Sequence, residues 1–193
     1  NANVTKIPAA AITSEDADLL WRMQERGEEI EINIKMGAVT EDKVSRNIIA
    51  DLQGTDLKNL LVVISGHIDS WDVGDGSMDD AGGSFISLFA PIVLKKLNLR
   101  PRRTIRTILF TGEEEGLFGA IAYENDHRNE NKNLSVVMES DFGTFAPLGL
   151  DYKGSPVGRC MIAEILKLFS AVNATSFGQS DPGPDISVWT TQG

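Results

Sequence analysis

The stretch that decides the fold is LLVVISGHIDSWDVGDGSMDDAGG, residues 60–83. Its apolar beginning, Leu60–Ile64, is typical of a strand that is buried on both faces of a sheet. This strand leads directly into one histidine and five aspartates, with no lysine or arginine among them. Because like charges repel each other, the acidic segment is either a solvated loop or the lining of a site for a strongly positive group.

Alternating strands and helices surround this stretch. Strands are expected over residues 47–52, 60–65, 104–111 and 134–140, and helices over 81–97, 116–125 and 155–172. Strands that alternate with helices predict a layered α/β domain with a largely parallel sheet. Continuous apolar strands indicate that both faces of this sheet are covered.

The N-terminal part of the chain has a different pattern. Residues 7–12 are expected to form a short strand, and residues 15–27 a helix that Thr13 or Ser14 caps. In residues 29–36 apolar and polar side chains alternate, which predicts a strand with one buried face. The polar segment 37–46 is the best boundary candidate, so we expect two parts, residues 1–44 and 45–193.

Acidic residues follow three of the predicted strands. His67 and Asp69 follow the first, Glu113, Glu114 and Glu115 follow the second, and Asp141 follows the third. Ligands of open α/β sheets bind beyond the carboxyl ends of the strands. The sequence therefore predicts that carboxylates from three strands meet at one rim of the sheet.

A cation would allow these carboxylates to lie together. Oxygen ligands alone would suit Ca²⁺ or Mg²⁺, whereas the added imidazole of His67 favours zinc or a related transition ion. Asp69 lies two residues after His67 and can orient its ring. The simpler alternatives are an acidic Ca²⁺ loop or a plain surface turn at 67–80, and at 113–115 acids that only favour a helix N-terminus. Taken together, the two segments supply metal ligands and a spare carboxylate, which metal-assisted hydrolysis requires.

Three motifs, in this order and spacing, carry a family resemblance: GHIDSWDVGDGSMDDAGG (66–83), RPRRTIRTILFTGEEEGLFGA (100–120) and VVMESDFGTF (136–145). They resemble the co-catalytic zinc exopeptidases. The resemblance implies a three-layer α/β fold around a central, mostly parallel mixed sheet, which is expected to be incomplete at the C-terminal end of this chain. It also implies a cis peptide bond between Asp79 and Asp80.

Matched motif by motif, the resemblance also implies a role for individual residues. The implied ligands of a first zinc are His67 and Asp141, the carboxylate that bridges two zinc ions is Asp79, a ligand of the second zinc is Glu114, the general base is Glu113, and the residue that supports His67 is Asp69. Glu115 receives no metal role.

The sequence departs from the family pattern in two places. The second zinc of the family takes one more histidine, and the other histidine of this chain, His127, matches no ligand position. The resemblance thus implies two Zn²⁺ per full-length subunit, with the second site one histidine short here. Residues 1–44 resemble the closing portion of an inserted, protease-associated-like cap domain, so we expect the chain to be truncated at both ends.

The expected activity is that of a zinc metallopeptidase of the carboxypeptidase or dipeptidase type. A water held by two zinc ions would lose its proton to Glu113 and attack the terminal peptide bond of a dipeptide or short peptide. Two alternatives stay open. One is a single-zinc, glutaminyl-cyclase-like acyltransferase, and the other is an inactive fragment that binds a metal or a partner without turnover.

Composition restricts the partners and the location. Lys and Arg number 18 and Asp and Glu number 28, and the resulting net charge of −10 argues against nucleic acid. No apolar run approaches the roughly 18–20 residues that span a bilayer, so no membrane segment is expected. Glycosylation triplets begin at Asn3, Asn133 and Asn173 and favour a secreted or lysosomal location. The single cysteine, Cys160, is expected to be buried and inert. A homodimer is a further possible assembly.

Overall fold

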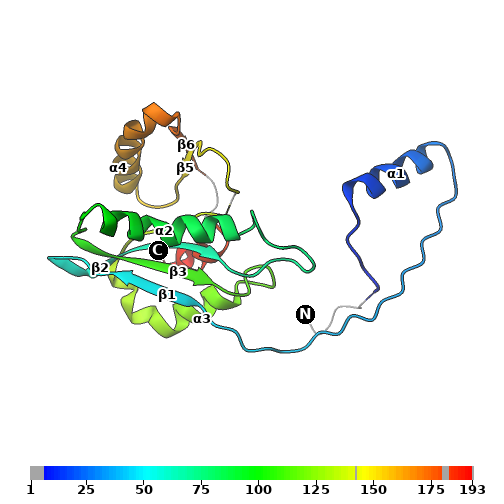
Figure 1. Cartoon of the computed structure of the whole chain (residues 1–193), viewed down its shortest axis with the longest axis horizontal. Helices are drawn as coiled ribbons and strands as arrows, with labels where there is room; N and C mark the ends of the chain where they lie inside the picture. The colour runs from blue at the N-terminus through cyan, green and yellow to red at the C-terminus, as the bar shows by residue number, and fades with distance from the viewer. Residues whose placement is uncertain (1–6, 142, 180–182, 193) are drawn as a thin grey trace. The chain divides into compact units, whose positions relative to one another are not determined.

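The computed structural model describes residues 7–141, 143–179 and 183–192. The chain forms two compact units, Asn1–Val44 and Ser45–Gly193. The helices and strands are α1 (Ser14–Glu25), β1 (Ile48–Leu52), β2 (Leu57–His67), α2 (Ala81–Lys96), β3 (Arg103–Phe110), α3 (Phe118–His127), η1 (Arg128–Asn133), β4 (Leu134–Glu139), β5 (Gly149–Asp151), α4 (Pro156–Leu166), η2 (Lys167–Val172), β6 (Ser176–Gly178) and η3 (Asp185–Gln192), where η marks a 3₁₀ helix (Figure 1). None of the helices in these described ranges is long and apolar enough to cross a membrane.

The first unit contains the predicted helix. Helix α1 begins after Thr13, whose hydroxyl accepts a hydrogen bond from the Asp16 N–H at 3.1 Å, and this satisfies one of the free N–H groups of the first turn. Gly27 follows the helix with φ +74°, a left-handed conformation that glycine adopts readily. The assignment of this unit to the end of a cap domain stays a prediction.

The two strands predicted on either side of α1 were wrong. Neither residues 7–12 nor residues 29–36 form a strand, and Ile32 and Met36 are exposed. An alternating pattern produces a strand only where a second strand supplies the ladder of hydrogen bonds. Within the described part of the first unit, no segment pairs with these residues.

The second unit is built on a four-stranded sheet of order β1-β3-β2-β4. Strand β2 runs parallel to β3 and to β4, and β1 pairs antiparallel with β3. Helix α2 covers one face of the sheet (Figure 1). On the other face α3 contributes to the core, and Val188 and Trp189 of η3 pack against it. This confirms the predicted three-layer fold with a mostly parallel mixed sheet.

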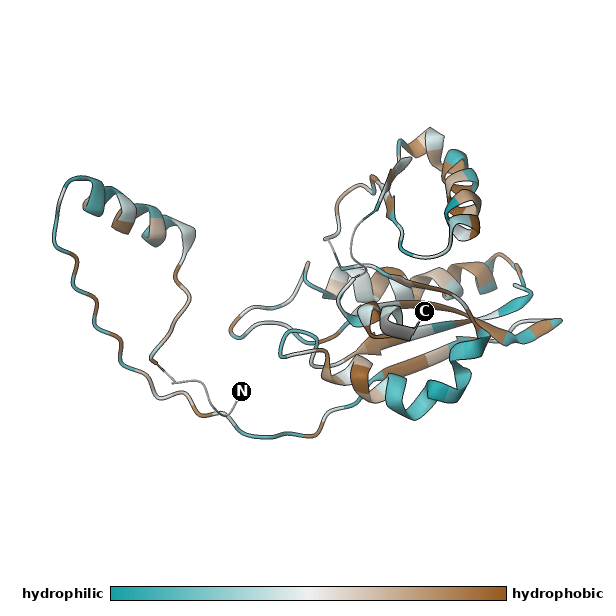
Figure 2. Cartoon of the chain, turned by 180° about the vertical axis from the view of Figure 1, so that it is seen from behind, coloured by the Kyte–Doolittle hydropathy of each residue, from teal (hydrophilic) through white to brown (hydrophobic). Residues whose placement is uncertain are grey.

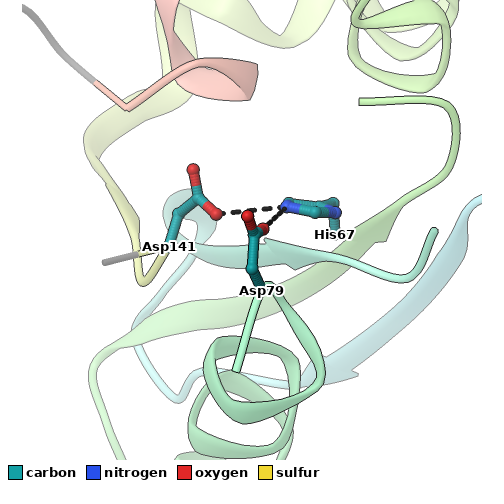
Figure 3. Close-up of side chains that lie close together, drawn as sticks. All are labelled: His67, Asp79 and Asp141. Carbon is teal, nitrogen blue, oxygen red and sulfur yellow. Dashed lines mark hydrogen bonds and ion pairs between the residues drawn. The ribbon is translucent and has the colours of Figure 1, made fainter. Parts of the chain in front are cut away.

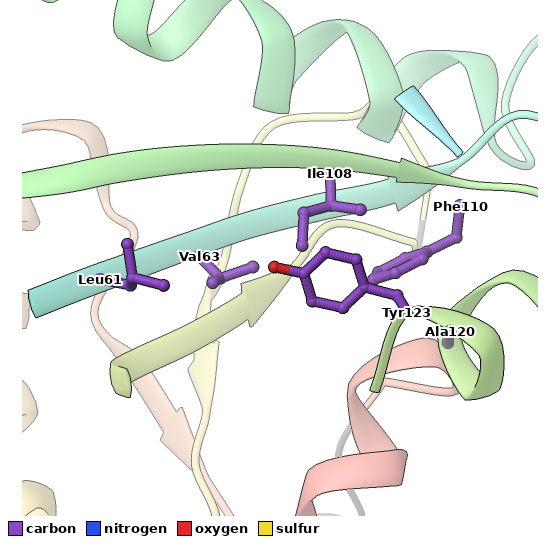
Figure 4. Packing of buried hydrophobic residues seen from close by; sticks show 6 residues of the cluster. All are labelled: Leu61, Val63, Ile108, Phe110, Ala120 and Tyr123. Carbon is purple, nitrogen blue, oxygen red and sulfur yellow. The ribbon is translucent and has the colours of Figure 1, made fainter. Parts of the chain in front are cut away.

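The main core lies between the sheet and α3. Alternate residues of β2 and β3 point to this face and meet two residues of α3, and the six side chains are Leu61, Val63, Ile108, Phe110, Ala120 and Tyr123 (Figure 4). Trp189 of η3 packs against this cluster, with its ring centroid 6.4 Å from that of Phe110. Figure 2 shows the same concentration of hydrophobic residues along the strands of the sheet. Burial of these rings holds the carboxyl ends of β2 and β3 in place.

The register of the parallel strands brings their ends to one rim. His67 pairs with Phe110 of β3, and Ser65 pairs with Glu139 of β4. The segments that follow these strands therefore leave the sheet side by side, as the sequence predicted.

The region after β4 differs from its prediction. The helix expected over 155–172 is α-helical only to Leu166 and continues as the 3₁₀ helix η2. Leu166 is buried, but Ile165 and Phe169 are exposed, and so is Cys160, which was expected to be buried. The short strands β5 and β6 pair in parallel with each other and were not predicted.

Candidate metal centre

The predicted ligands meet at the rim of the sheet. His67 is the last residue of β2, Glu113 and Glu114 follow β3, and Asp141 follows β4. Asp79 lies in the loop that connects β2 with α2. Side chains separated by up to 74 positions in sequence thus come into contact.

The imidazole of His67 lies at the centre of the group. Its Nε2 is 3.0 Å from Asp79 Oδ1 and 3.1 Å from Asp141 Oδ1. Figure 3 shows both carboxylates directed toward this nitrogen. Glu113 Oε2 is slightly farther from the same nitrogen, at 3.8 Å. The His67 side chain is fully buried, whereas Asp79 leaves 64% of its side chain exposed, so the centre opens to solvent on the Asp79 side.

The donor atoms fit a zinc ion in number, type and spacing. One ligand atom each from His67, Asp79 and Asp141 lies within 4.8 Å of the others, and the same holds for His67, Glu113 and Glu114. An imidazole with carboxylates is a donor set that zinc takes in catalytic centres.

The electrostatics of the centre also favour a cation. Burial favours the neutral imidazole, but the hydrogen bond and charge of Asp141, together with the nearby acids, raise the pKa of His67 to about 10. Burial raises the pKa of Glu113, and burial with the charge of Asp79 raises that of Glu114. The acids around His67 crowd negative charge into the centre, and a divalent ion would neutralise it.

Asp69 connects the histidine with the acidic loop. Its Oδ1 accepts the Glu113 N–H and its Oδ2 accepts the Glu114 N–H, both at 3.1 Å. His67 Nδ1 lies 3.1 Å from the Asp69 carbonyl oxygen and 3.6 Å from Asp69 Oδ1. Asp69 therefore contacts the Nδ1 side of the His67 ring and also fixes the backbone of Glu113 and Glu114.

The substitution Asp69→Asn tests this connection. An asparagine keeps one acceptor but presents an NH₂ donor where the second N–H needs an acceptor, so the loop of Glu113 and Glu114 should shift. Residues that orient metal ligands typically contribute about 10–100-fold to metal affinity or activity, and we expect a loss in that range. Zinc titration and kcat/KM measure it. Asp75→Asn, an exposed aspartate of the same loop, should behave like the wild type, and equal effects of both changes would contradict the assignment.

The Asp79–Asp80 peptide bond is cis, as the resemblance implied, and Asp72–Val73 is a second cis bond that was not predicted. The predictions also missed the side chains of Asp80 and Ser84, which bond to the backbone of His67. The sequence pattern that could have identified Asp80 is its position three residues before Gly83. An aspartate that caps a helix accepts a backbone N–H at that spacing.

Two buried carboxyl groups lie outside the predicted ligand set. Asp185 is fully buried, and burial, together with the charge of Glu113, raises its pKa. Burial and the charge of Asp185 raise the pKa of Glu139. Among the described residues, both Asp185 oxygens and Glu139 Oε1 have no hydrogen-bond partner. They extend the acidic region beneath the rim.

Two residues left out of the predicted ligand set lie outside both donor groups. His127 is half-buried rather than freely exposed, because its ring stacks on Tyr123 at 4.1 Å and its Nδ1 lies 3.0 Å from the Tyr123 carbonyl oxygen. Glu115 is exposed next to Glu114.

Comparison with known proteins identifies close relatives. Residues 47–193 match the model of "Peptidase family M28". The chain is 47% identical to carboxypeptidase Q of Xenopus laevis over 99% of its own length, but covers 41% of that protein. The crystal structure of a peptidase M28 precursor from Shewanella amazonensis superposes with a TM-score of 0.92 at 32% identity, covering 100% of this chain and 44% of the other. A zinc aminopeptidase from Bacillus subtilis, at 23% identity and a TM-score of 0.61 over 75% of this chain and 37% of the other, shares the fold. These similarities confirm the predicted resemblance to zinc exopeptidases, and to carboxypeptidase Q among them.

Proposed function

The chain belongs to peptidase family M28, and we propose that the protein is a zinc-dependent exopeptidase that hydrolyses terminal peptide bonds of dipeptides or short peptides. The observation that carries this proposal is the convergence of His67, Asp79 and Asp141 within 4.8 Å, with Glu113 and Glu114 beside them. The chain spans about two-fifths of the length of its curated relatives, so the activity is proposed for the full-length protein.

The donors divide naturally between two zinc ions. His67 and Asp141 would hold the first, Glu114 would hold the second, and Asp79 would bridge them. Both donor groups of the structure contain His67, but its Nε2 can bind only one ion. The second ion would therefore depend on Asp79 and Glu114, and on a further ligand that the residues described here do not supply.

Glu113 is the proposed general base. Its carboxylate lies 3.8 Å from His67 Nε2, farther than the carboxylates of Asp79 and Asp141, which lie at 3.0 and 3.1 Å. Zinc, when bound, supplies a Lewis acid that polarises the peptide carbonyl and lowers the pKa of water. Glu113 would accept the proton of the attacking water and pass it to the leaving amine. Burial raises the pKa of Glu113 above that of an exposed glutamate, which favours this exchange in both directions.

Metal counting and a peptidase assay on the full-length protein test the proposal. We expect two zinc ions per subunit and hydrolysis of unblocked dipeptides, which a chelator abolishes and added zinc restores. One zinc per subunit together with cyclisation of N-terminal glutaminyl peptides would instead support an acyltransferase. Tight zinc binding without turnover of either substrate would support a binding protein.

The proposed location is the secretory pathway or the lysosome. Of the glycosylation triplets within the described residues, Asn173 is exposed and Asn133 is half-buried. Asn173 is therefore the better acceptor. The homodimer stays a prediction.

A further inference from the structure

The first turn of α2 contacts the backbone of His67 on both sides. Asp80 caps α2, and its Oδ1 accepts the Gly83 N–H at 2.9 Å. Its other oxygen, Oδ2, accepts the His67 N–H at 2.9 Å, and the residue is 1% exposed. Ser84, one turn along, donates its hydroxyl to the His67 carbonyl oxygen at 2.7 Å.

The position of His67 in the sheet explains why these bonds exist. The pairing of β2 with β4 ends at Ser65 and Glu139, so His67 lies beyond the last ladder pair on that side. Buried backbone groups without a ladder partner must find another one. Asp80 and Ser84 supply both partners.

Glycines allow the close approach that these bonds require. A Cβ atom on Gly66 would lie 2.5 Å from Asp80 Oδ2 and 2.7 Å from the Ser84 backbone nitrogen. A Cβ atom on Gly83 would collide with the Ser140 carbonyl oxygen. The α2 terminus is thus packed directly onto the ends of β2 and β4, at the residues that precede two of the proposed zinc ligands.

We propose that Asp80 and Ser84 are positioning residues that hold His67 in register with Asp79 and thereby set the affinity of the first zinc site. Asp80 is covalently joined to Asp79 and hydrogen-bonded to His67. It therefore fixes both residues of the 3.0 Å contact between His67 Nε2 and Asp79 Oδ1. Ser84 prevents the histidine backbone from rotating about that bond. This inference rests on the proposed zinc site, and it adds residues that touch neither the metal nor the substrate.

The chain offers a matched control for Ser84. Ser87 lies on the same helix and donates its hydroxyl to the carbonyl oxygen of Ser65, on the same strand, also at 2.7 Å. The two serines are equally buried, at 5% and 4% exposure. Their acceptors differ: Ser84 bonds to the metal-binding residue itself, whereas the Ser65 carbonyl oxygen also accepts the Ser140 N–H at 3.1 Å.

The test compares Ser84→Ala with Ser87→Ala in the full-length protein. Both changes should lower the melting temperature of the zinc-free protein, because each removes one buried hydrogen bond. Ser87→Ala should lower it less, because the Ser65 carbonyl oxygen keeps its bond from the Ser140 N–H. Only Ser84→Ala should weaken zinc, by about tenfold in a competition titration with a chromogenic chelator, while Ser87→Ala stays within about twofold. Asp80→Asn should weaken zinc by about 10–100-fold, since one of its two N–H partners then faces a donor.

Equal zinc affinities of the two serine variants would overturn the proposal. So would an Asp80→Asn protein that binds zinc normally despite a lower melting temperature, because Asp80 would then act only as a helix cap. If Asp80→Asn does not fold, the serine pair still decides. The titration uses no substrate, so a wild type that binds zinc but cleaves no peptide would refute the proposed function and leave this inference standing. A wild type that binds no zinc would overturn the inference.

Discussion

Glu113→Gln is expected to lower kcat/KM for a dipeptide by about 10²–10⁴-fold while the protein keeps its zinc. The amide has the shape of the carboxylate but cannot accept the proton of the attacking water. The zinc should remain, because the His67 nitrogen has two closer carboxylate oxygens, at 3.0 and 3.1 Å, than the Glu113 oxygen at 3.8 Å. Steady-state kinetics and metal analysis of the same preparation measure both effects.

Glu115→Gln is the matched control for this change. It makes the same substitution two residues along the acidic loop, on a side chain that is exposed and outside both donor groups. Its activity should equal that of the wild type. Near-normal turnover of Glu113→Gln would show that another group is the base. Loss of zinc together with activity would show that Glu113 is a ligand, a role that its place beside Glu114 in the second donor group also allows.

The acidic rim of the sheet could be predicted from the sequence because short, local patterns specify it. Apolar runs such as Leu60–Ile64 specify buried strands, and parallel strands deliver their carboxyl ends to one edge. The order β3-β2-β4 then follows from burial of the most apolar strand in the middle. The residues that each strand end delivers could therefore be named before any contact was known.

Other features depend on partners far away in the sequence. Strands β5 and β6 have three residues each, and only their mutual pairing defines them. The opposite case is the segment 29–36. It has the alternating pattern of a strand but forms none, because no strand among the described residues pairs with it. Local periodicity cannot distinguish these cases, because a strand is completed by a second strand.

Two supporting side chains of the site were not predicted, in contrast to Asp69. Asp80 and Ser84 contact His67 only because Gly66 lets helix α2 approach within hydrogen-bonding distance. The burial of Asp185 likewise follows from the packing of η3 against β4 and α3. Such contacts depend on the distance between layers, which the sequence pattern does not specify.

Asp79→Ala is expected to remove zinc and reduce peptidase activity to background. Asp79 is the ligand proposed to serve both ions, so its loss should weaken both sites at once. Its side chain is 64% exposed, in contrast to the fully buried His67. Truncation should therefore leave the packing and the melting temperature of the zinc-free protein almost unchanged, which makes Asp79 a cleaner test than His67.

Thermal unfolding with and without zinc separates loss of binding from loss of folding. At a free zinc concentration 1,000 times the dissociation constant, binding stabilises a folded protein by about 4 kcal/mol. The wild type should show this rise in melting temperature, Asp75→Ala on the same exposed loop should match it, and Asp79→Ala should show little or none. If Asp79→Ala gained the full stabilisation, the zinc ions would have to bind elsewhere. Without the shared carboxylate, the proposed site would lack the negative charge that keeps two cations close together.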